Sequence, residues 1–283
     1  ASPLLRACSL GTRWGRLLAS QAVKRAPWNV RPLLGVPELP NLKGWALFAQ
    51  AHAALWTLEG KGEDRDAALR LLRAVAERRV ETPWGWGYPH PWQDWGFYLA
   101  ADAPNRVVTA FVLEAFLEAG RRLGTDEFLP AARRAAAFLV DAPRTLPRGE
   151  GVHALTYVPR SDNDWAVVDV SALSAAALAE LSVASGEPSW REKAGPLMKF
   201  VLSVQTPEGA WFYADPPSAS AIRHDNYHTG FITDATFRYA EGAPDADARR
   251  AGERGLDFYR DRLFEPDGAP RFQSHRPWPR DIH

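Results

Sequence analysis

The phrase Asp225-Asn226-Tyr227-His228 places a carboxyl group and an imidazole three residues apart at the expected start of a helix. Side chains at this spacing lie on one face of a helix, and a helix cap by itself would need only the Asp. Clustered ionisable groups in a cleft are the usual setting for acid–base catalysis. We therefore predict acid–base roles for Asp225 and His228. The candidate carboxylate partners are Asp94, Asp164 and Asp281.

A second candidate site is the segment Trp84–Trp95, which concentrates aromatic and polar side chains on one expected loop. Aromatic faces can stack against sugar rings, while amide, carboxyl and imidazole groups supply directional hydrogen bonds. The alternative is a loop that packs on itself as a lid, and the sequence favours neither interpretation. The side chains predicted to bind substrate are Trp84, Trp86, Tyr88, His90, Trp92 and Gln93 in this loop, and Trp211, Tyr213, Asn226, Tyr227 and His283 elsewhere.

Other polar residues at expected helix starts have a simpler interpretation. Asn105 and Asp169 are predicted to be N-caps, because Asn and Asp side chains accept hydrogen bonds from the unpaired amides of a first turn. Residues 161–164, Ser-Asp-Asn-Asp, offer the acid pair that glycoside hydrolysis requires, but an Asx turn is the favoured interpretation of this run.

We predict no metal and no cofactor. Nitrogen and oxygen ligands for a metal are offered by His90, Asp225, His228, Asp281 and His283. None of these has the paired spacing of a zinc-protease helix, and the single cysteine, Cys8, cannot build a thiolate site. The sequence contains no phosphate-binding P-loop, no dinucleotide fingerprint and no GxSxG elbow, so nucleotide, NAD and serine-hydrolase functions have no support.

The composition argues against several classes of partner. The chain has 34 basic and 34 acidic side chains, a balance that does not fit a protein that neutralises nucleic-acid phosphates or an anionic membrane. No apolar run approaches the roughly 20 residues of a spanning helix. The basic segment at residues 4–25 is expected to be an outer helix of the fold rather than a membrane-surface helix. We predict a carbohydrate ligand, no nucleic acid, no stable membrane insertion and, from the single cysteine, a cytoplasmic protein.

The elements that must position these side chains are helical hairpins. Apolar residues recur at three- and four-residue spacing in eight segments, which predicts eight amphipathic or buried helices. In the later pairs the first member is apolar around most of its circumference and the second is charged on one side, which indicates inner and outer helices. The pairs are Gly44–Leu58 with Asp64–Arg79, Arg106–Leu123 with Asp126–Val140, Val170–Ala184 with Ser189–Val204, and His228–Ala240 with Asp245–Leu263.

The joints between these helices predict the architecture. Joints within a pair are short and contain Gly, whereas joints between pairs run to roughly 20 residues or more and carry aromatic side chains. A hairpin repeat of about 60 residues is typical of a closed or solenoidal helical array. We predict an all-α fold, an α/α toroid of helical hairpins with the long aromatic loops at one end. Residues 1–283 would form a single domain that is truncated at both ends, because four hairpins do not close the usual six-hairpin ring.

Four phrases together resemble a bacterial and archaeal family of uncharacterised α/α-toroid proteins. They are Trp28-Asn29-Val30-Arg31-Pro32-Leu33-Leu34-Gly35, Trp86-Gly87-Tyr88-Pro89 with Trp92-Gln93, Asp225-Asn226-Tyr227-His228-Thr229-Gly230-Phe231, and Asp281-Ile282-His283. The resemblance covers about residues 27–283. It implies a fold-level relation to six-hairpin glycosidases, polysaccharide lyases and terpenoid-cyclase-like toroids, and genes that often lie near those for polysaccharide synthesis. Separately, residues 205–211 match the QxxxGxW turn of terpenoid cyclases, which ties helices together and performs no chemistry.

The leading functional hypothesis is a carbohydrate-active enzyme that works on a polysaccharide or glycan by hydrolysis, lyase elimination or epimerisation. Hydrolysis needs two carboxyl groups about 5 to 9.5 Å apart. Elimination from a uronate needs a His or Tyr base and a cation or Asn that neutralises the acid group. The alternatives are a non-catalytic glycan-binding or assembly protein and a terpenoid-cyclase-like enzyme, although the sequence lacks the DxDD run that such an enzyme uses. The sequence does not give the sugar, the linkage or the oligomeric state.

Overall fold

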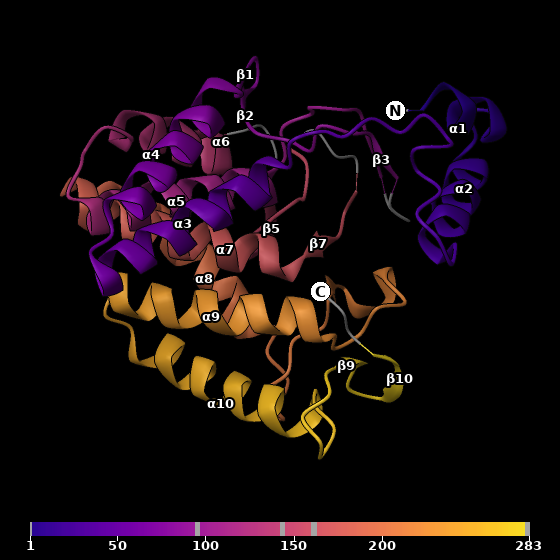
Figure 1. Ribbon diagram of the computed structural model, residues 1–283. Helices are drawn as coiled ribbons and strands as arrows, with labels where there is room; N and C mark the ends of the chain where they lie inside the picture. Colours follow the sequence, from indigo (N-terminus) through magenta and orange to yellow (C-terminus); the bar gives the residue numbers. More distant parts are fainter. Residues whose placement is uncertain (1, 94–96, 142–144, 160–162, 281–283) are drawn as a thin grey trace.

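The computed structural model describes all residues except 1, 94–96, 142–144, 160–162 and 281–283. Across the described residues, eight long helices form the four expected hairpins (Figure 1). The hairpins are α3 (Leu42–Glu59) with α4 (Gly62–Glu77), α5 (Arg106–Leu123) with α6 (Leu129–Asp141), α7 (Val168–Ser185) with α8 (Pro188–Ser203), and α9 (Asn226–Gly242) with α10 (Ala246–Arg262). All four predicted pairs are confirmed, with boundaries a few residues from those expected.

Four of these helices form an inner layer that the other four cover. The helix α3 packs against α5, α5 against α7, and α7 against α9, while each outer helix packs mainly on its own partner (Figure 1). This arrangement confirms the α/α toroid. Among the described residues only α7 has the length and hydropathy of a membrane span, and 72% of it is buried inside the protein, where it serves as a core helix.

Local sequence sets where the inner helices begin and end. The Asn105 side chain accepts a hydrogen bond from the main-chain N–H of Val108 at 2.9 Å, so Asn105 is the N-cap of α5 as predicted. The helices α5 and α7 end at Gly124 and Gly186, whose φ angles of 65° and 70° are left-handed. Glycine adopts this conformation without steric penalty, so each helix stops there and reverses into its outer partner.

The long connections gather at one end of the layer, because each inner helix begins directly after such a connection (Figure 1). They form short antiparallel ladders: β1 (Val80–Glu81) with β2 (Trp84–Gly85), β3 (Trp92–Gln93) with β4 (Tyr98–Leu99), β5 (Thr145–Gly149) with β6 (Val152–Leu155), β7 (Ala166–Val167) with β8 (Ala214–Asp215), and β9 (Arg271–Gln273) with β10 (Arg276–Arg280). The β7–β8 ladder joins the second connection to the third, and a bridge between Asp225 and Gln273 joins the third to the fourth. The β7–β8 ladder and this bridge therefore link the second, third and fourth connections into a rim beside the inner helix starts.

Two tryptophans of the long connections belong to the core. Trp86 is 0% exposed and Trp211 is 1% exposed. The indole N–H of Trp86 donates to the main-chain oxygen of Val75 in the last turn of α4 at 2.8 Å, and that of Trp211 donates to Val201 in the last turn of α8 at 2.9 Å. The Trp211 indole thus donates to a carbonyl in the last turn of α8, and the Trp86 indole shares the Val75 carbonyl with the main-chain N–H of Arg78. Both side chains were predicted to bind substrate, and their burial makes them part of the hydrophobic core instead.

Two polar side chains tie separate elements together. Gln205 donates from Nε2 to the main-chain oxygen of Ala251 in α10 at 2.9 Å, which is the structural role that the QxxxGxW turn implies. Arg106 is fully buried, and it donates to the main-chain oxygens of Leu139 in α6 at 2.9 Å and Thr156 in the following connection at 2.8 Å. Buried hydrogen bonds of a charged donor to carbonyl groups fix the relative positions of these elements.

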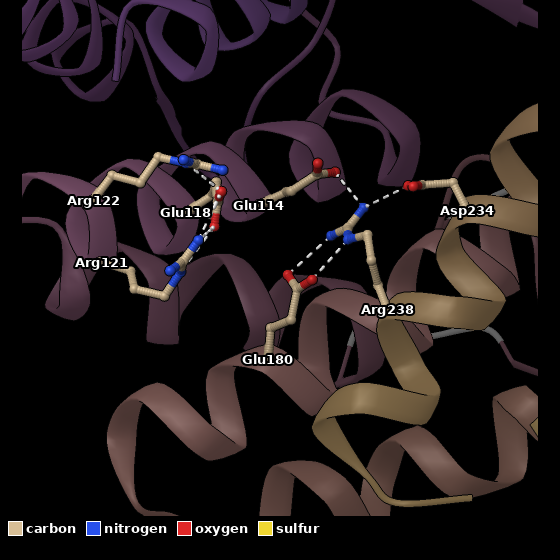
Figure 2. Close-up of polar contacts among 7 residues, drawn as sticks. All are labelled: Glu114, Glu118, Arg121, Arg122, Glu180, Asp234 and Arg238. Carbon is tan, nitrogen blue, oxygen red and sulfur yellow. Dashed lines mark hydrogen bonds and ion pairs between the residues drawn. The ribbon is translucent and has the colours of Figure 1, made fainter. Parts of the chain in front are cut away.

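An ion-pair cluster joins three inner helices at the end opposite the rim. Figure 2 shows Arg238 of α9 between Glu114 of α5, Glu180 of α7 and Asp234 of its own helix, at N–O distances of 2.8, 2.7 and 3.4 Å. These four side chains line an open cavity of about 920 Å³, most of whose lining residues come from the second halves of α5, α7 and α9. The cavity thus lies toward the second halves of these helices, whereas the predicted site lies at their starts, and Glu114 is near enough to Lys43 for its charge to act on it.

The N-terminal segment differs from expectation. It forms two short helices, α1 (Pro3–Cys8) and α2 (Arg13–Arg25), neither of which buries a residue. In Figure 1 these indigo helices lie beside β3 and away from the helical layers. Arg16 attaches α2 to the rim through a 2.9 Å hydrogen bond to Gln93. The prediction of an outer helix was wrong, because the proline-rich stretch 26–41 cannot continue a helix and so holds α2 away from α3.

Candidate functional site

The first turn of α9 presents the predicted acid–base pair. Asp225 is the N-cap of this helix, and its Oδ1 accepts the main-chain N–H of His228 at 2.9 Å. The same carboxylate contacts the imidazole Nδ1 of His228, with Oδ1 at 2.8 Å and Oδ2 at 3.0 Å. Asp225 is 2% exposed, whereas the His228 side chain is 22% exposed. One buried carboxylate thus caps the helix and orients a partly accessible imidazole.

This contact fixes how His228 can handle a proton. Because Nδ1 must donate to the carboxylate, the neutral imidazole carries its lone pair on Nε2. Nε2 lies 3.9 Å from the Oδ2 atom of Asp169, a buried residue in the first turn of α7. Burial lowers the pKa of His228, but the charges of Asp225 and Asp169 outweigh it, and the net effect raises the pKa. His228 is therefore suited to accept a proton at Nε2 and to be stabilised as imidazolium.

Asp169 was predicted to be a cap, and the structure gives it a different position. The N-cap of α7 is Val167, and Asp169 lies inside the first turn with 3% of its surface exposed. Its Oδ1 atom is buried and has no hydrogen-bond partner among the described residues. Burial raises the pKa of Asp169, although His228 and Lys43 oppose this. An incompletely bonded carboxyl group that faces an imidazole can hold a substrate hydroxyl or share a proton.

Lys43 reaches the same site from the first turn of α3, the first inner helix of the chain, whereas His228 lies in the first turn of α9, the last. Its Nζ donates to the Tyr227 hydroxyl at 2.7 Å, across 184 residues of sequence. The ammonium also lies 4.0 Å from the ring centroid of Phe111 and 4.8 Å from that of Phe231. Burial lowers the pKa of Lys43 to about 8, against the opposing charges of Asp169 and Glu114. A cation therefore stands next to the residue that precedes His228.

Tyrosines from three long connections line the remainder of the site. The Tyr213 ring packs edge-on to the His228 ring, with centroids 4.6 Å apart. Tyr88 and Tyr157 are hydrogen-bonded to each other, and the negative charge of Asp169 contributes to raising the pKa of both. Burial raises the pKa of Tyr157 well above its usual value, so its hydroxyl stays protonated at neutral pH. These hydroxyl and ring groups give the imidazole a polar, aromatic surround.

The aromatic loop divides between site and scaffold. The Trp92 ring packs edge-on to Tyr88 at 5.8 Å and to Tyr157 at 5.3 Å, so Trp92 adjoins the site. His90 is exposed, and Gln93 is occupied by hydrogen bonds to Arg16 and to the main chain of the loop. Trp84 instead packs edge-on to the core residue Trp86 and under a guanidinium of α6, away from His228.

The remaining predicted residues lie elsewhere or outside the described part of the chain. Asn226 is buried, with its amide donating to the Leu263 main chain at 3.0 Å and its carbonyl accepting from Tyr259 at 2.8 Å, so it serves packing. Asp164 is exposed, and its main-chain oxygen accepts from Arg148. Asp94, Asp281 and His283 lie outside the described residues. Within the residues that the structure describes, no group of three or more His, Cys, Asp or Glu side chains is placed to hold a metal.

Three site residues escaped the sequence analysis as functional groups: Lys43, Tyr157 and Asp169. Lys43 is the only Lys or Arg in residues 42–59, a mostly apolar and aromatic helix, and this isolation was an available signal. Asp169 is the one charged residue in the first turn of α7, where capping accounted for it equally well. Tyr157 had no sequence signal, because its placement depends on the β5–β6 ladder and the turn that follows.

Comparison with known proteins places the chain among toroid enzymes by fold alone. No family model matches the sequence, and no curated protein matches it. A cellobiose 2-epimerase from Bacillus thermoamylovorans B4167 superimposes with a TM-score of 0.62 at 12% identity, over 97% of this chain and 82% of that one. The GH76 α-mannanase BT2949 from Bacteroides thetaiotaomicron gives 0.58 at 12% identity, over 99% and 78%. A polysaccharide lyase gives 0.57 at 14% identity, over 80% of this chain and 62% of its own length. The fold is thus the α/α toroid of six-hairpin glycosidases, lyases and epimerases.

Proposed function

We propose that this protein is a carbohydrate-active enzyme whose chemistry is proton transfer at a sugar carbon, as in lyase elimination or epimerisation. The observation that carries the proposal is the His228–Asp225 pair, with Nε2 directed toward Asp169 inside a rim of tyrosines. Perturbed ionisable groups clustered in this way are characteristic of catalytic sites. The names of proteins with the same fold, an epimerase, a mannanase and a lyase among them, support a carbohydrate as the ligand.

The arrangement of carboxyl groups favours proton transfer over hydrolysis. A glycosidase needs an acid on one side of the glycosidic bond and a base or nucleophile on the other. Asp225 is 2% exposed and already bonded to a main-chain N–H and to the imidazole. Asp169 faces the same imidazole from its other side. The two carboxyl groups therefore flank His228, one at each ring nitrogen.

The proposed step starts with neutral His228. Its Nε2 takes the proton from a carbon adjacent to a carboxylate or carbonyl of the sugar, and Asp225 stabilises the resulting imidazolium. In an elimination, the electron pair of the C–H bond becomes a C=C bond, the C–O bond to the neighbouring sugar breaks, and the imidazolium returns its proton to the leaving oxygen. In an epimerisation, water protonates the same carbon from the opposite face, and the imidazolium loses its proton to solvent.

The test uses wild-type protein, His228→Asn and a matched control, His52→Asn. His52 also pairs with an aspartate, at 2.7 Å from Asp64, but it does so between α3 and α4. A panel of acidic and neutral bacterial polysaccharides is followed by reducing ends, by the absorbance of unsaturated uronate and by deuterium uptake at sugar carbons from D₂O. We expect deuterium uptake or unsaturated product with wild type and His52→Asn, and a loss of about a hundredfold or more with His228→Asn.

Other results separate the alternatives. New reducing ends without an unsaturated product or deuterium uptake would favour hydrolysis. Binding without turnover across the whole panel would contradict the enzyme proposal and favour a glycan-binding or assembly protein.

A further inference from the structure

Lys43 is a buried cation that forms no ion pair with any residue that the structure describes. It is 8% exposed, and among the described residues its Nζ forms no ion pair and has a single hydrogen-bond acceptor, the Tyr227 hydroxyl. An ammonium has three N–H donors. The ammonium also lies over the rings of Phe111, Tyr227 and Phe231, which attract a cation but accept no conventional hydrogen bond. The carboxylates of Asp169 and Glu114 act on it through their charge without forming an ion pair with it.

Such an arrangement is unfavourable unless something else completes it. A buried charge without a partner is costly, and most buried lysines are paired. The nearby Asp169 is also incomplete, because its buried Oδ1 has no hydrogen-bond partner among the described residues. Unsatisfied donors on Lys43 and an unsatisfied acceptor on Asp169 therefore stand on two sides of His228 and Tyr227. This is the pattern expected of a site built to receive a polar ligand.

We infer that Lys43 binds a carboxylate of the substrate, so that the site selects acidic sugars, the hexuronates, over neutral ones. The inference rests on the proposed function for the reaction but makes a separate claim about recognition. A carboxylate would accept hydrogen bonds from the free Nζ donors, and a sugar hydroxyl would donate to Asp169. Charge-assisted hydrogen bonds of this kind are about twice as strong as neutral ones.

The same contact would assist the chemistry at Nε2 of His228. Loss of a proton from the carbon next to a carboxylate moves negative charge onto the carboxylate oxygens. A cation beside those oxygens stabilises that charge where it develops. Asn226, the other neutralising group that the sequence offered, is already bonded to Leu263 and Tyr259. Lys43 is therefore the group near the acid–base pair that can serve this purpose.

The test measures binding, with D-glucuronate and D-galacturonate as probes and D-glucose and D-galactose as their neutral counterparts. The proteins are wild type, Lys43→Met, Lys43→Arg and the surface control Lys193→Met, whose ammonium pairs with Asp141 away from the site. Affinities come from calorimetry or saturation-transfer NMR, and thermal melting verifies folding. Lys43→Met removes an unpaired buried charge, so we expect it to melt no lower than wild type at pH 7.

We expect wild type and Lys193→Met to bind one uronate at least about tenfold more tightly than its neutral counterpart, the preference that one charge-assisted contact supplies. Lys43→Met should lose this preference while still binding neutral sugar, and Lys43→Arg should retain part of it. Uronate should also raise the pKa of Lys43, measured by ¹³C NMR of the dimethylated lysine. Equal or undetectable uronate binding by wild type, or an unchanged preference in a folded Lys43→Met protein, would overturn the inference.

These outcomes are independent of the enzyme proposal. A uronate preference that disappears in Lys43→Met, together with no turnover of any polysaccharide, would leave a uronate-binding site and remove the enzyme. Turnover of neutral polysaccharides without any uronate preference would keep the enzyme and remove the role of Lys43.

Discussion

At the scale of single residues, Asp225 performs two tasks with one carboxylate. It closes the first turn of α9 through the main-chain N–H of His228 and holds the imidazole of the same residue through Nδ1. Helix geometry fixes the position of the N-cap carboxylate, and its contact with Nδ1 in turn fixes the orientation of the imidazole. The Asp–His spacing of three residues is what brings the two groups together on one face. Capping and the proposed proton transfer are thus not alternative explanations for this pair.

Replacing Asp225 with Asn should separate the two tasks. Asn caps helices about as well as Asp, so we expect only a small change in the free energy of unfolding at neutral pH. The pKa of His228, which Asp225 and Asp169 raise against the effect of burial, should fall. Turnover should fall by about a hundredfold or more, because an amide stabilises imidazolium poorly. NMR titration of the imidazole and single-turnover kinetics measure the two effects.

Asp245→Asn is the control, since Asp245 caps α10 in the same way and has no histidine partner among the described residues. A raised pKa of a histidine in the fold stabilises the protein below its ordinary pKa, and this stabilisation is lost as the pH rises through the folded value. Asp225→Asn should weaken that pH dependence, because only Asp169 then opposes the effect of burial on His228, and Asp245→Asn should leave it unchanged. An unchanged pKa of His228 in Asp225→Asn would contradict the assignment.

At the scale of elements, each of two outer helices ends against the tryptophan of the connection that follows it. Trp86 closes α4 and Trp211 closes α8 through the same indole-to-carbonyl bond. In both cases the ring fills core space below a long connection and fixes where that connection leaves the helix. The tryptophans therefore position the rim and do not touch the space beside His228. Trp92, whose ring contacts Tyr88 and Tyr157, remains the tryptophan adjoining the site.

Substitutions should distinguish these two kinds of tryptophan. Trp86→Ala should destabilise the fold by about 3 to 5 kcal/mol, the usual range for removing a buried tryptophan. Trp86→Phe should cost about 0.5 to 1.5 kcal/mol, because it removes the indole hydrogen bond while the Val75 carbonyl keeps the main-chain N–H of Arg78 as a donor. Neither should change the affinity for sugar in protein that remains folded, whereas Trp92→Ala should weaken it. Urea unfolding and sugar titrations provide the measurements. Weaker sugar binding by folded Trp86→Phe would instead indicate that Trp86 contributes to substrate binding.

At the scale of the whole molecule, the inner layer carries charge at both ends. The rim end holds Lys43, Asp169, Asp225 and His228, and the opposite end holds Arg238 among three carboxylates (Figure 2). Arg238 contacts residues from α5, α7 and α9, so one guanidinium links three of the four inner helices. Burial raises the pKa of Glu114 to about 7, because Glu180 and Asp234 add to the effect of burial and Arg238 only partly opposes it.

Glu114→Gln should therefore change how stability depends on pH. A carboxyl group with a raised pKa in the fold stabilises the protein fully below its ordinary pKa, and this stabilisation is lost as the pH rises through about 7. The variant lacks this loss, so its stability relative to wild type should increase between pH 5 and pH 8 by at most about 3 kcal/mol. Glu118→Gln, on the same helix but paired with Arg121 and Arg122, is the control that should show no such increase. Urea unfolding of each protein at pH 5 and pH 8 would detect the difference. The prediction would be refuted if the free energies of unfolding of Glu114→Gln and wild type changed equally between the two pH values.

The sequence by itself determined the hairpins and the acid–base pair. Helical periodicity, the short Gly joints and the Asp–His spacing are local properties of the chain, and local geometry follows from them. Accordingly the eight helices and the Asp225–His228 contact agree with the sequence analysis. The N-terminal helix α2 was misplaced, because its own periodicity contains no information on which surface it packs against.

Only the tertiary structure decided which other residues join that pair. Lys43 meets Tyr227 across 184 residues, and Asp169 faces His228 from a different hairpin. The side chains of Trp86 and Trp211 are buried in the core, although the sequence predicted that they bind substrate. The physical reason is that the inner helices all begin at one rim, so the packing of the helices, and not the spacing along the chain, sets which first turns converge. A buried position and a binding position can have the same local sequence, and only the neighbours supplied by the fold distinguish them.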